Sequence, residues 1–183
     1  MDLLASPMKF HLRRVDREIN DPKALKRILL HSKHFILSLA DGGEPYAVPM
    51  GYVYDEKENV VYFHCAKEGK KMEFIKRSPR TWGVVVVDQG IMEGACVNMY
   101  ASVMFSGRIE FVEDSAEKAK VMNHFAEKLS SNVEGVKARV QNLFGGDGSA
   151  LNGVIFAKIR LEELTGKRST EMTVEKLLKI IGD

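Results

Sequence analysis

The chain has 183 residues, of which 27 are basic and 25 acidic, giving a formal net charge of +2. This length predicts one domain over residues 1–183 with a sizeable core, and the nearly balanced charge argues against a nucleic-acid partner. No apolar stretch approaches the roughly 20 residues of a membrane helix, and the start lacks the pattern of a signal peptide. Cys65 and Cys96 form no disulfide framework, so we expect a cytoplasmic protein whose two reduced thiols pack as small apolar groups.

The first third of the chain predicts a helix followed by three strands. An Asp-Pro pair opens residues 21–31 and supplies an N-cap and a first-turn proline, which indicates a helix there. Residues 34–65 alternate apolar runs with Asp-Gly-Gly and Glu-Lys-Glu-Asn turns, the pattern of strand, turn, strand, turn and strand. Pro45 and Pro49 cannot donate ladder hydrogen bonds, so we expect the middle strand to lie at an edge of the sheet, or to carry a bulge or a break near Pro49.

The central part of the sequence predicts a short helix and two long β segments. Residues 69–77 form the helix, which a Ser-Pro pair stops. The apolar run TWGVVVV at 81–87 is uninterrupted, which is typical of a strand that is covered on both faces. Residues 96–113 predict one long strand, or two strands that bend at Ser106 and Gly107.

The last third predicts mainly helices. A capping-box pattern opens a helix at 114–129, a second helix follows and ends at Gly145 and Gly146, and Thr173 caps a terminal helix. The run GVIFAKIRL at 153–161 reads as the last strand. The count is about six strands and five short helices, without repeated βαβ units. We therefore predict a mainly β (α+β) fold, a six-stranded antiparallel barrel surrounded by short helices.

One junction in the sequence points to an anion. An apolar strand ends near His64, and a helix then begins at Gly69 with Lys70 and Lys71. Cations are disfavoured at a helix N-terminus unless an anion sits beside them. Taken alone, the lysines are better explained as a solvated pair on a surface helix, and His64 as a strand-end histidine that is bonded to backbone.

Motifs of other enzyme classes are missing from the sequence. The Gly-Lys pair at 166–167 lacks the earlier glycine of a P-loop, and there is no HExxH, GxSxG or dinucleotide fingerprint. Hydrolases and metalloenzymes, including any metal site, therefore find little support.

Three segments in this order resemble a known family: PYAVPMGYVYDEKENVVYFHCAKEGKK, YASVMFSGRIEFVED and LEELTGKRS. The chain is similar to the FMN-binding split barrels related to pyridoxamine-phosphate oxidase, and among them to the nitroimidazole-resistance proteins. The hairpin in the first segment is the specific part, and the resemblance covers about residues 25–168. It implies a split β-barrel homodimer with FMN in a groove between the two subunits, and hence two equivalent sites.

The resemblance also implies roles for individual residues. Lys70 and Lys71 would hold the FMN phosphate, helped by backbone N–H groups near Gly69. His64 stands where the nitroimidazole-resistance proteins carry an active-site histidine, and it would be the catalytic proton donor. The remaining cofactor contacts implied are Val48, Pro49, Met50 and Gly51 along the flavin ring, Tyr52 and Phe63 flanking the groove or filling the barrel, Ser102 on the strand that lines the dimer groove, and Lys167.

The implied activity is that of an FMN-dependent oxidoreductase of the nitroimidazole-reductase type, with a small nitro compound or a related molecule as acceptor and NAD(P)H as a candidate donor. No arginine-rich run matches the pyridoxal-phosphate site of the oxidases, which argues against pyridoxine-phosphate oxidation. Two alternatives stay open. One is a non-enzymatic flavin or haem carrier or sensor, with His64 as an axial haem ligand. The other is a protein–protein adaptor without a cofactor.

Overall fold

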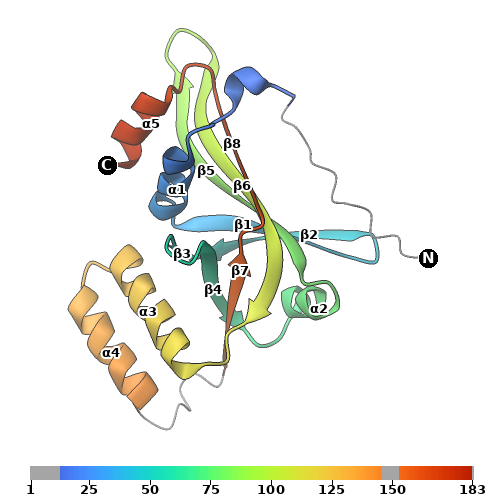
Figure 1. The fold of residues 1–183 in the computed structure, drawn as a ribbon, viewed down its shortest axis with the longest axis vertical. Helices are drawn as coiled ribbons and strands as arrows, with labels where there is room; N and C mark the ends of the chain where they lie inside the picture. The colour runs from blue at the N-terminus through green and yellow to red at the C-terminus, as the bar shows by residue number, and fades with distance from the viewer. Residues whose placement is uncertain (1–12, 146–152, 183) are drawn as a thin grey trace.

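A computed structural model describes residues 13–145 and 153–182 of the chain (Figure 1). Its elements in the first half are η1 (Val15–Arg17), α1 (Pro22–His31), β1 (His34–Asp41), β2 (Glu44–Gly51), β3 (Val53–Asp55), β4 (Val60–Ala66) and α2 (Lys70–Arg77). In the second half they are β5 (Arg80–Met92), β6 (Val97–Phe111), α3 (Ser115–Leu129), α4 (Val133–Gly145), β7 (Val154–Arg160), β8 (Glu163–Arg168) and α5 (Val174–Ile181).

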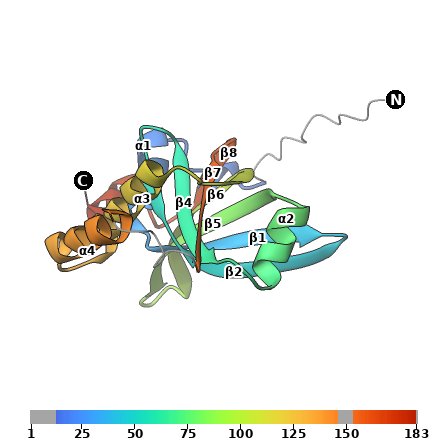
Figure 2. The same ribbon diagram turned by 90° about the horizontal axis from the view of Figure 1, so that it is seen from below.

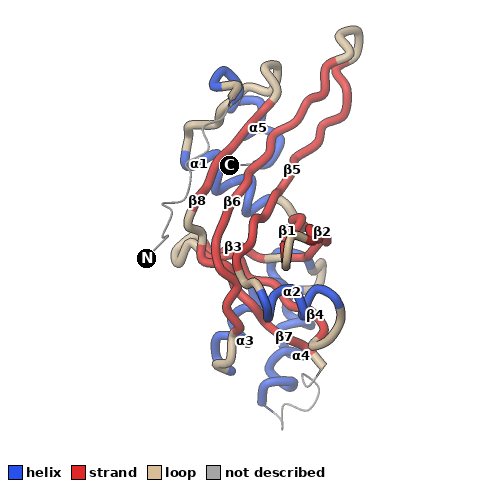
Figure 3. The backbone as a smooth tube through the Cα atoms, turned by 90° about the vertical axis from the view of Figure 1, so that its right-hand side faces the viewer, coloured by secondary structure: helices blue, strands red, loops and turns tan. Residues whose placement is uncertain are grey.

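The strands form one antiparallel sheet in the order β2-β1-β5-β6-β7-β4-β3, with β8 added to β6. The long strand β6 belongs to two arms of the sheet. The upper arm consists of β2, β1, β5, the first part of β6 and β8, and the lower arm consists of the end of β6 with β7, β4 and β3. Figure 3 shows β8, β6 and β5 side by side, with the hairpin formed by β5 and β6 projecting beyond β8. The antiparallel α+β prediction is confirmed, but the sheet has eight strands rather than six. The two that the sequence did not separate are β3, which Tyr52 divides from β2, and β8.

Helix starts follow the capping signals in the sequence. The Asp21 carboxylate accepts the Lys23 N–H at 2.8 Å, and Asp114 accepts the Glu117 N–H at 2.7 Å. At the last helix, the Thr173 hydroxyl accepts a backbone N–H at 3.2 Å. Each side chain satisfies a donor that the helix itself leaves unpaired. The prediction that a helix ends at Gly145 and Gly146 is met at Gly145; Gly146 lies outside the described residues.

The barrel interior is aromatic. The Phe35 ring lies 5.4 Å from Tyr52, 6.0 Å from Phe63 and 5.7 Å from Phe105, centroid to centroid. Such ring pairs contribute about 0.5–1.5 kcal/mol beyond the area that they bury. Gly107 lets β6 pass close to the other arm, because a Cβ there would stand 2.3 Å from the Arg160 carbonyl oxygen.

Helices lie on two sides of the sheet. Figure 2 shows α2 beside the β1–β2 hairpin, and α3 with α4 on the other side, next to β4. Under α3 lies a second, smaller apolar cluster that includes Tyr62, Val121, Phe125 and Phe156. This cluster packs α3 against the sheet.

The outer face of the upper arm differs from the expectation for TWGVVVV. Side chains of β5 alternate between the barrel and the surface: Val85 and Val87 are buried, whereas Val86 is 54% exposed. The prediction of a strand covered on both faces is therefore wrong for the single chain. Within this chain only one face of the strand has a core to pack against.

Both cysteines are free thiols, as expected. Cys65 is buried, with its sulfur 3.7 Å from that of Met72, so it packs as a small apolar group. Cys96 is exposed in the β5–β6 turn with a φ of 46°, so the expectation that it packs in the interior is wrong.

Candidate functional site

The N-terminus of α2 is an open, positively charged cradle. Gly69 precedes the helix with a φ of 109°, and nothing lies within 4 Å of the position of a Cβ there. This conformation favours glycine. No side chain among the described residues caps the helix, and the Met72 N–H donates to the Gly69 carbonyl at 2.9 Å. The N–H groups of Gly69, Lys70 and Lys71 have no hydrogen-bond partner in the described part of the chain, so they are available to an anion.

Lys70 lies on the surface beside this cradle. Its ammonium is 3.6 Å from a Glu44 carboxylate oxygen, and both side chains are more than half exposed. The ammonium also lies 5.1 Å from the centre of the Tyr46 ring and 5.4 Å from that of Phe74. An exposed pair of this kind contributes little to stability, so Lys70 can exchange its partner for a bound anion at small cost.

Lys71 points toward the barrel rather than away from it. Its Nζ donates to the Met50 sulfur at 3.3 Å. Its charge lowers the pKa of His64 and also opposes the rise that burial causes in the pKa of Cys65. Thus Lys71 of α2 contacts Met50 of β2 and acts through its charge on His64 of β4. These three residues, which the sequence singled out, belong to one site.

His64 presents its ring between solvent and an aromatic wall. It lies on β4 and is exposed, yet its ring centre is 4.9 Å from that of Phe125 and 5.9 Å from that of Phe156. Contact with this wall lowers the pKa of His64 from its ordinary value, and Lys71 lowers it further. The imidazole is therefore mainly neutral at pH 7 and becomes charged only in more acid solution.

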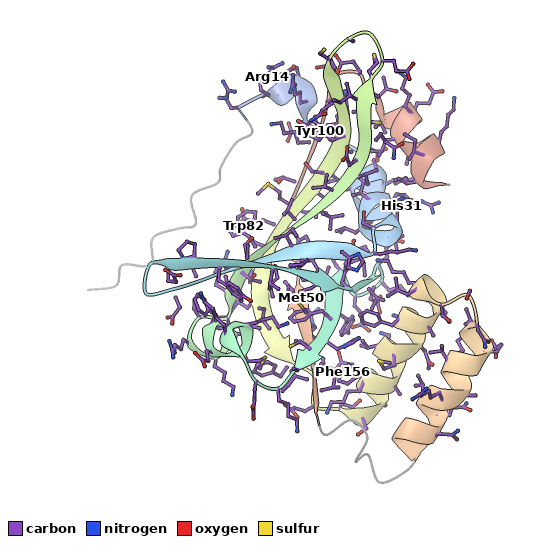
Figure 4. All side chains as sticks on the ribbon, turned by 180° about the vertical axis from the view of Figure 1, so that it is seen from behind. Arg14, His31, Met50, Trp82, Tyr100 and Phe156 are labelled. Carbon is purple, nitrogen blue, oxygen red and sulfur yellow. The ribbon has the colours of Figure 1, made fainter. Side chains whose placement is uncertain are left out.

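Strand β2 is the edge strand that its prolines predicted, since among the described residues it pairs with β1 alone. Along its last residues Val48 is half-buried, Pro49 is exposed and Met50 is buried. A Cβ at Gly51 would meet nothing within 4 Å, so a flat molecule can approach the backbone there. Figure 4 shows Met50 and Trp82 on opposite sides of the β1–β2 hairpin.

Tyr52 and Phe63 lie inside the barrel. Both side chains are completely buried, and the Tyr52 hydroxyl donates to the Leu29 carbonyl at 2.7 Å. Of the two roles considered for them, the structure favours filling of the barrel over contact with a ligand in a groove.

Ser102 and Lys167 form a separate pair on the upper arm. They face each other across β6 and β8, and the Ser102 hydroxyl donates to the Lys167 carbonyl at 3.4 Å. No hydrogen bond or ion pair joins them to Lys71 or His64 in the part of the chain that the structure describes. The predicted site residues therefore fall into two groups within one chain.

A row of apolar residues connects these two groups along the outer face. Strand register places five side chains in line across β2, β1, β5, β6 and β8: Pro49, Ile36, Val84, Met104 and Thr165. Ile36 and Met104 are 37% and 44% exposed, and the adjacent Val86 faces Ser102. Sequence reasoning missed this apolar row, although the uninterrupted apolar run at 81–87 was its signal.

Two cavities lie away from these residues. One, of about 660 Å³, is lined by α3, β3 with its following turn, and Leu30 of α1. The other, of about 360 Å³, lies between α5 and the β5–β6 hairpin. Among residues 13–145 and 153–182, no group of three His, Cys, Asp or Glu side chains could hold a metal ion. None of the described helices is long and apolar enough to cross a membrane.

Comparison with known proteins assigns the chain to a family. Residues 21–168 match the family described as pyridoxamine 5'-phosphate oxidase, and the chain belongs to that family. No curated protein matches it. The matched residues include every predicted site residue.

Solved structures show the same fold at low sequence identity. A candidate 5-nitroimidazole antibiotic resistance protein from Bacteroides thetaiotaomicron has a TM-score of 0.68 and 23% identity, over 82% of this chain and 86% of that one. The flavocytochrome Anf3 from Azotobacter vinelandii has a TM-score of 0.70 and 20% identity, over 90% and 74%. The FAD and haem binding protein from Mycobacterium smegmatis has a TM-score of 0.66 and 13% identity, over 91% and 81%.

Proposed function

We propose that two copies of this chain bind FMN between them and act as an oxidoreductase of the nitroimidazole-reductase type. The observation that carries the proposal is the convergence of Lys71, Met50 and His64 beside the open N-terminus of α2. This place offers a phosphate cradle, an accessible edge strand and a titratable group. Membership of the oxidase family and the flavin-binding neighbours support the choice of a flavin.

In this proposal each part of the site has one task. Gly69 N–H, Lys70 and Lys71 bind the phosphate, while β2 from Val48 to Gly51 lies along the flavin ring. When bound, FMN supplies hydride transfer at its N5 atom, chemistry that no side chain of the protein provides. His64 holds the proton that the reduced acceptor takes up.

The homodimer is the second part of the proposal. The apolar row from Pro49 to Thr165 ends near Ser102 and Lys167. Within one chain these two residues form a group separate from Lys71. A second copy on this face would cover Val86 and Met104, and it would bring its own Ser102 and Lys167 toward the first copy's α2. Exposed apolar side chains that lie together on one face are typical of such an interface.

A direct experiment tests the flavin and the reaction together. The purified protein should bind FMN at micromolar concentration, and FMN should bind more tightly than riboflavin. Under anaerobic conditions NADH or NADPH should bleach the flavin absorption band, and a nitroimidazole should restore it. A folded dimer that binds no flavin would refute the proposal, and bleaching without recovery would refute the choice of acceptor.

A carrier or sensor of flavin or haem is the second candidate. It is favoured by the accessible His64 ring with its lowered pKa, because a neutral imidazole is the form that binds haem iron. Two structural neighbours are a flavocytochrome and a protein that binds FAD and haem. A Soret band on addition of haem, lost in His64→Ala, would select this candidate over the enzyme.

A further inference from the structure

The larger cavity, of about 660 Å³, lies where α1, β3 and α3 meet. Figure 1 shows the end of α1, β3 and the end of α3 converging on one side of the molecule. No residue of the predicted flavin site lines this cavity, and its volume lies within the range of small-molecule sites.

The carboxylates in the cavity wall are already paired with lysines. These carboxylates lie at the end of β3, on the turn that follows it and on α3. Their ion pairs, with the N–O distances, are Asp55–Lys120 at 2.8 Å, Glu58–Lys120 at 2.5 Å, Glu56–Lys26 at 3.3 Å and Glu127–Lys137 at 2.8 Å. The charged or titratable wall residues outside these pairs are Tyr54, Lys57, His124 and Lys128, and the Tyr54 hydroxyl donates to the Asn59 side-chain oxygen at 2.8 Å. Within the described part of the chain, none of these four forms an ion pair.

Lys128 lines the cavity and is half-buried. Its Nζ donates to the Leu29 carbonyl at 3.3 Å, and it lies 3.8 Å from the centre of the Tyr52 ring. The carbonyl and the ring favour the ammonium, but burial dominates and lowers the pKa of Lys128 to about 7. A large fraction of this amine is therefore unprotonated near neutral pH, whereas an ordinary lysine has a pKa of about 10.4.

His124 lies one turn before Lys128 on α3 and lines the same cavity. Residues four apart on a helix are neighbours on one face. An imidazole in this position can deliver and remove the protons that a reaction at the amine requires.

We propose that Lys128 is a carbonyl-reactive lysine that binds a small aldehyde or ketone in this cavity as a reversible imine. Nζ attacks the carbonyl carbon, and a C–N bond forms as the carbonyl oxygen takes up a proton. The carbinolamine then loses one water molecule as the C=N bond forms. The sequence of steps needs no oxidant or reductant, and hydrolysis reverses it. It is independent of the flavin proposal, because it uses another face of the fold.

The experiment traps the imine in the full-length protein. Benzaldehyde is added at pH 7, sodium borohydride reduces the imine, and mass spectrometry of peptides measures the benzylated fraction at each lysine. We expect Lys128 to be labelled at least about tenfold faster than Lys57, because burial lowers the pKa of Lys128 to about 7 and leaves a large fraction of this amine unprotonated at the pH of the reaction. Lys57 is the internal control, since it lines the same cavity from the exposed turn.

Two variants and a pH series complete the test. Lys128→Arg keeps a cation near the Leu29 carbonyl and should abolish the label at this position, whereas Lys57→Arg should leave labelling of Lys128 unchanged. The labelling rate at Lys128 should rise with pH and level off above about pH 7. Equal labelling of the two lysines in the parent protein, or no levelling for Lys128, would overturn the proposal; both results are obtained without a variant.

Discussion

His64 combines an exposed position with a pKa below that of an ordinary histidine. Burial of its ring against Phe125 and Phe156 disfavours the charged form, and the positive charge of Lys71 does the same. Since the free imidazole has a pKa of about 6.5, the imidazolium of His64 becomes abundant only below that pH. A proton delivered by His64 is thus available mainly in acid solution.

This gives a prediction for catalysis. In His64→Gln, FMN should stay bound and the donor should still reduce it, because the phosphate and ring contacts lie on α2 and β2. Reoxidation by a nitro compound should slow by about 10²–10⁴-fold, the usual loss when a general acid is removed. The parent rate should rise as the pH falls through and below 6.5, and the variant should lack this rise; stopped-flow absorbance measures both.

The control is His31→Gln, which changes an exposed histidine at the end of α1. It should behave as the parent does. If the flavin in His64→Gln is reoxidised at the parental rate, His64 has no catalytic role and is only a strand-end residue. If the variant loses FMN binding, His64 is a cofactor contact rather than a proton donor.

At the scale of elements, α2 shows how a short helix can form an anion site. Its apolar face buries Met72, Phe74 and Ile75 against the barrel, which holds the uncapped N-terminus in place. The lysines that are poorly placed for helix stability are well placed for a phosphate.

Replacing Lys70 and Lys71 together by alanine should weaken FMN binding by about 10–100-fold, the equivalent of one charge-assisted hydrogen bond. Riboflavin, which has no phosphate, should lose much less. Fluorescence titration with both flavins measures the difference. The variant Lys23→Ala/Lys76→Ala carries the same change in net charge away from the cradle and should bind FMN as the parent does. An equal loss for both flavins would show that the two lysines do not bind the phosphate.

At the scale of the whole molecule, the outer face of the upper arm is the surface that a single chain leaves uncovered. Val86, Met104 and Ile36 are exposed there beside Ser102. Such a surface loses apolar contact with water when a second copy packs on it.

Val86→Glu should therefore convert the dimer to a monomer and abolish FMN binding, because a charge would be buried at the interface. Size-exclusion chromatography with light scattering measures the mass, and circular dichroism checks that the fold is kept. Leu129→Glu changes a side chain of similar exposure on α3, away from this face, and should leave the dimer intact. A parent protein that is monomeric at high concentration would contradict the homodimer.

Features that depend on neighbouring residues could be predicted from the sequence. Helix starts at Asp21, Asp114 and Thr173 were correct because each cap bonds an N–H two or three residues ahead. The edge position of β2 was correct because proline cannot donate to a second neighbour. The phosphate-binding role of Lys70 and Lys71 came from the family resemblance and stays a prediction; the structure adds that the helix begins there without a side-chain cap.

Features that depend on distant segments were decided only by the tertiary structure. Strand β8 gave no sequence signal because its side chains are mixed, and it is held by pairing with β6, some sixty residues earlier. An apolar strand has the same sequence pattern whether both of its faces are buried within the chain or one face is left exposed. The exposure of Val86 therefore could not be predicted from the sequence. Likewise, the position of Lys128 against Leu29 and Tyr52 arises where three separate elements meet. Local sequence governs local hydrogen bonds, whereas burial and proximity are properties of the folded chain.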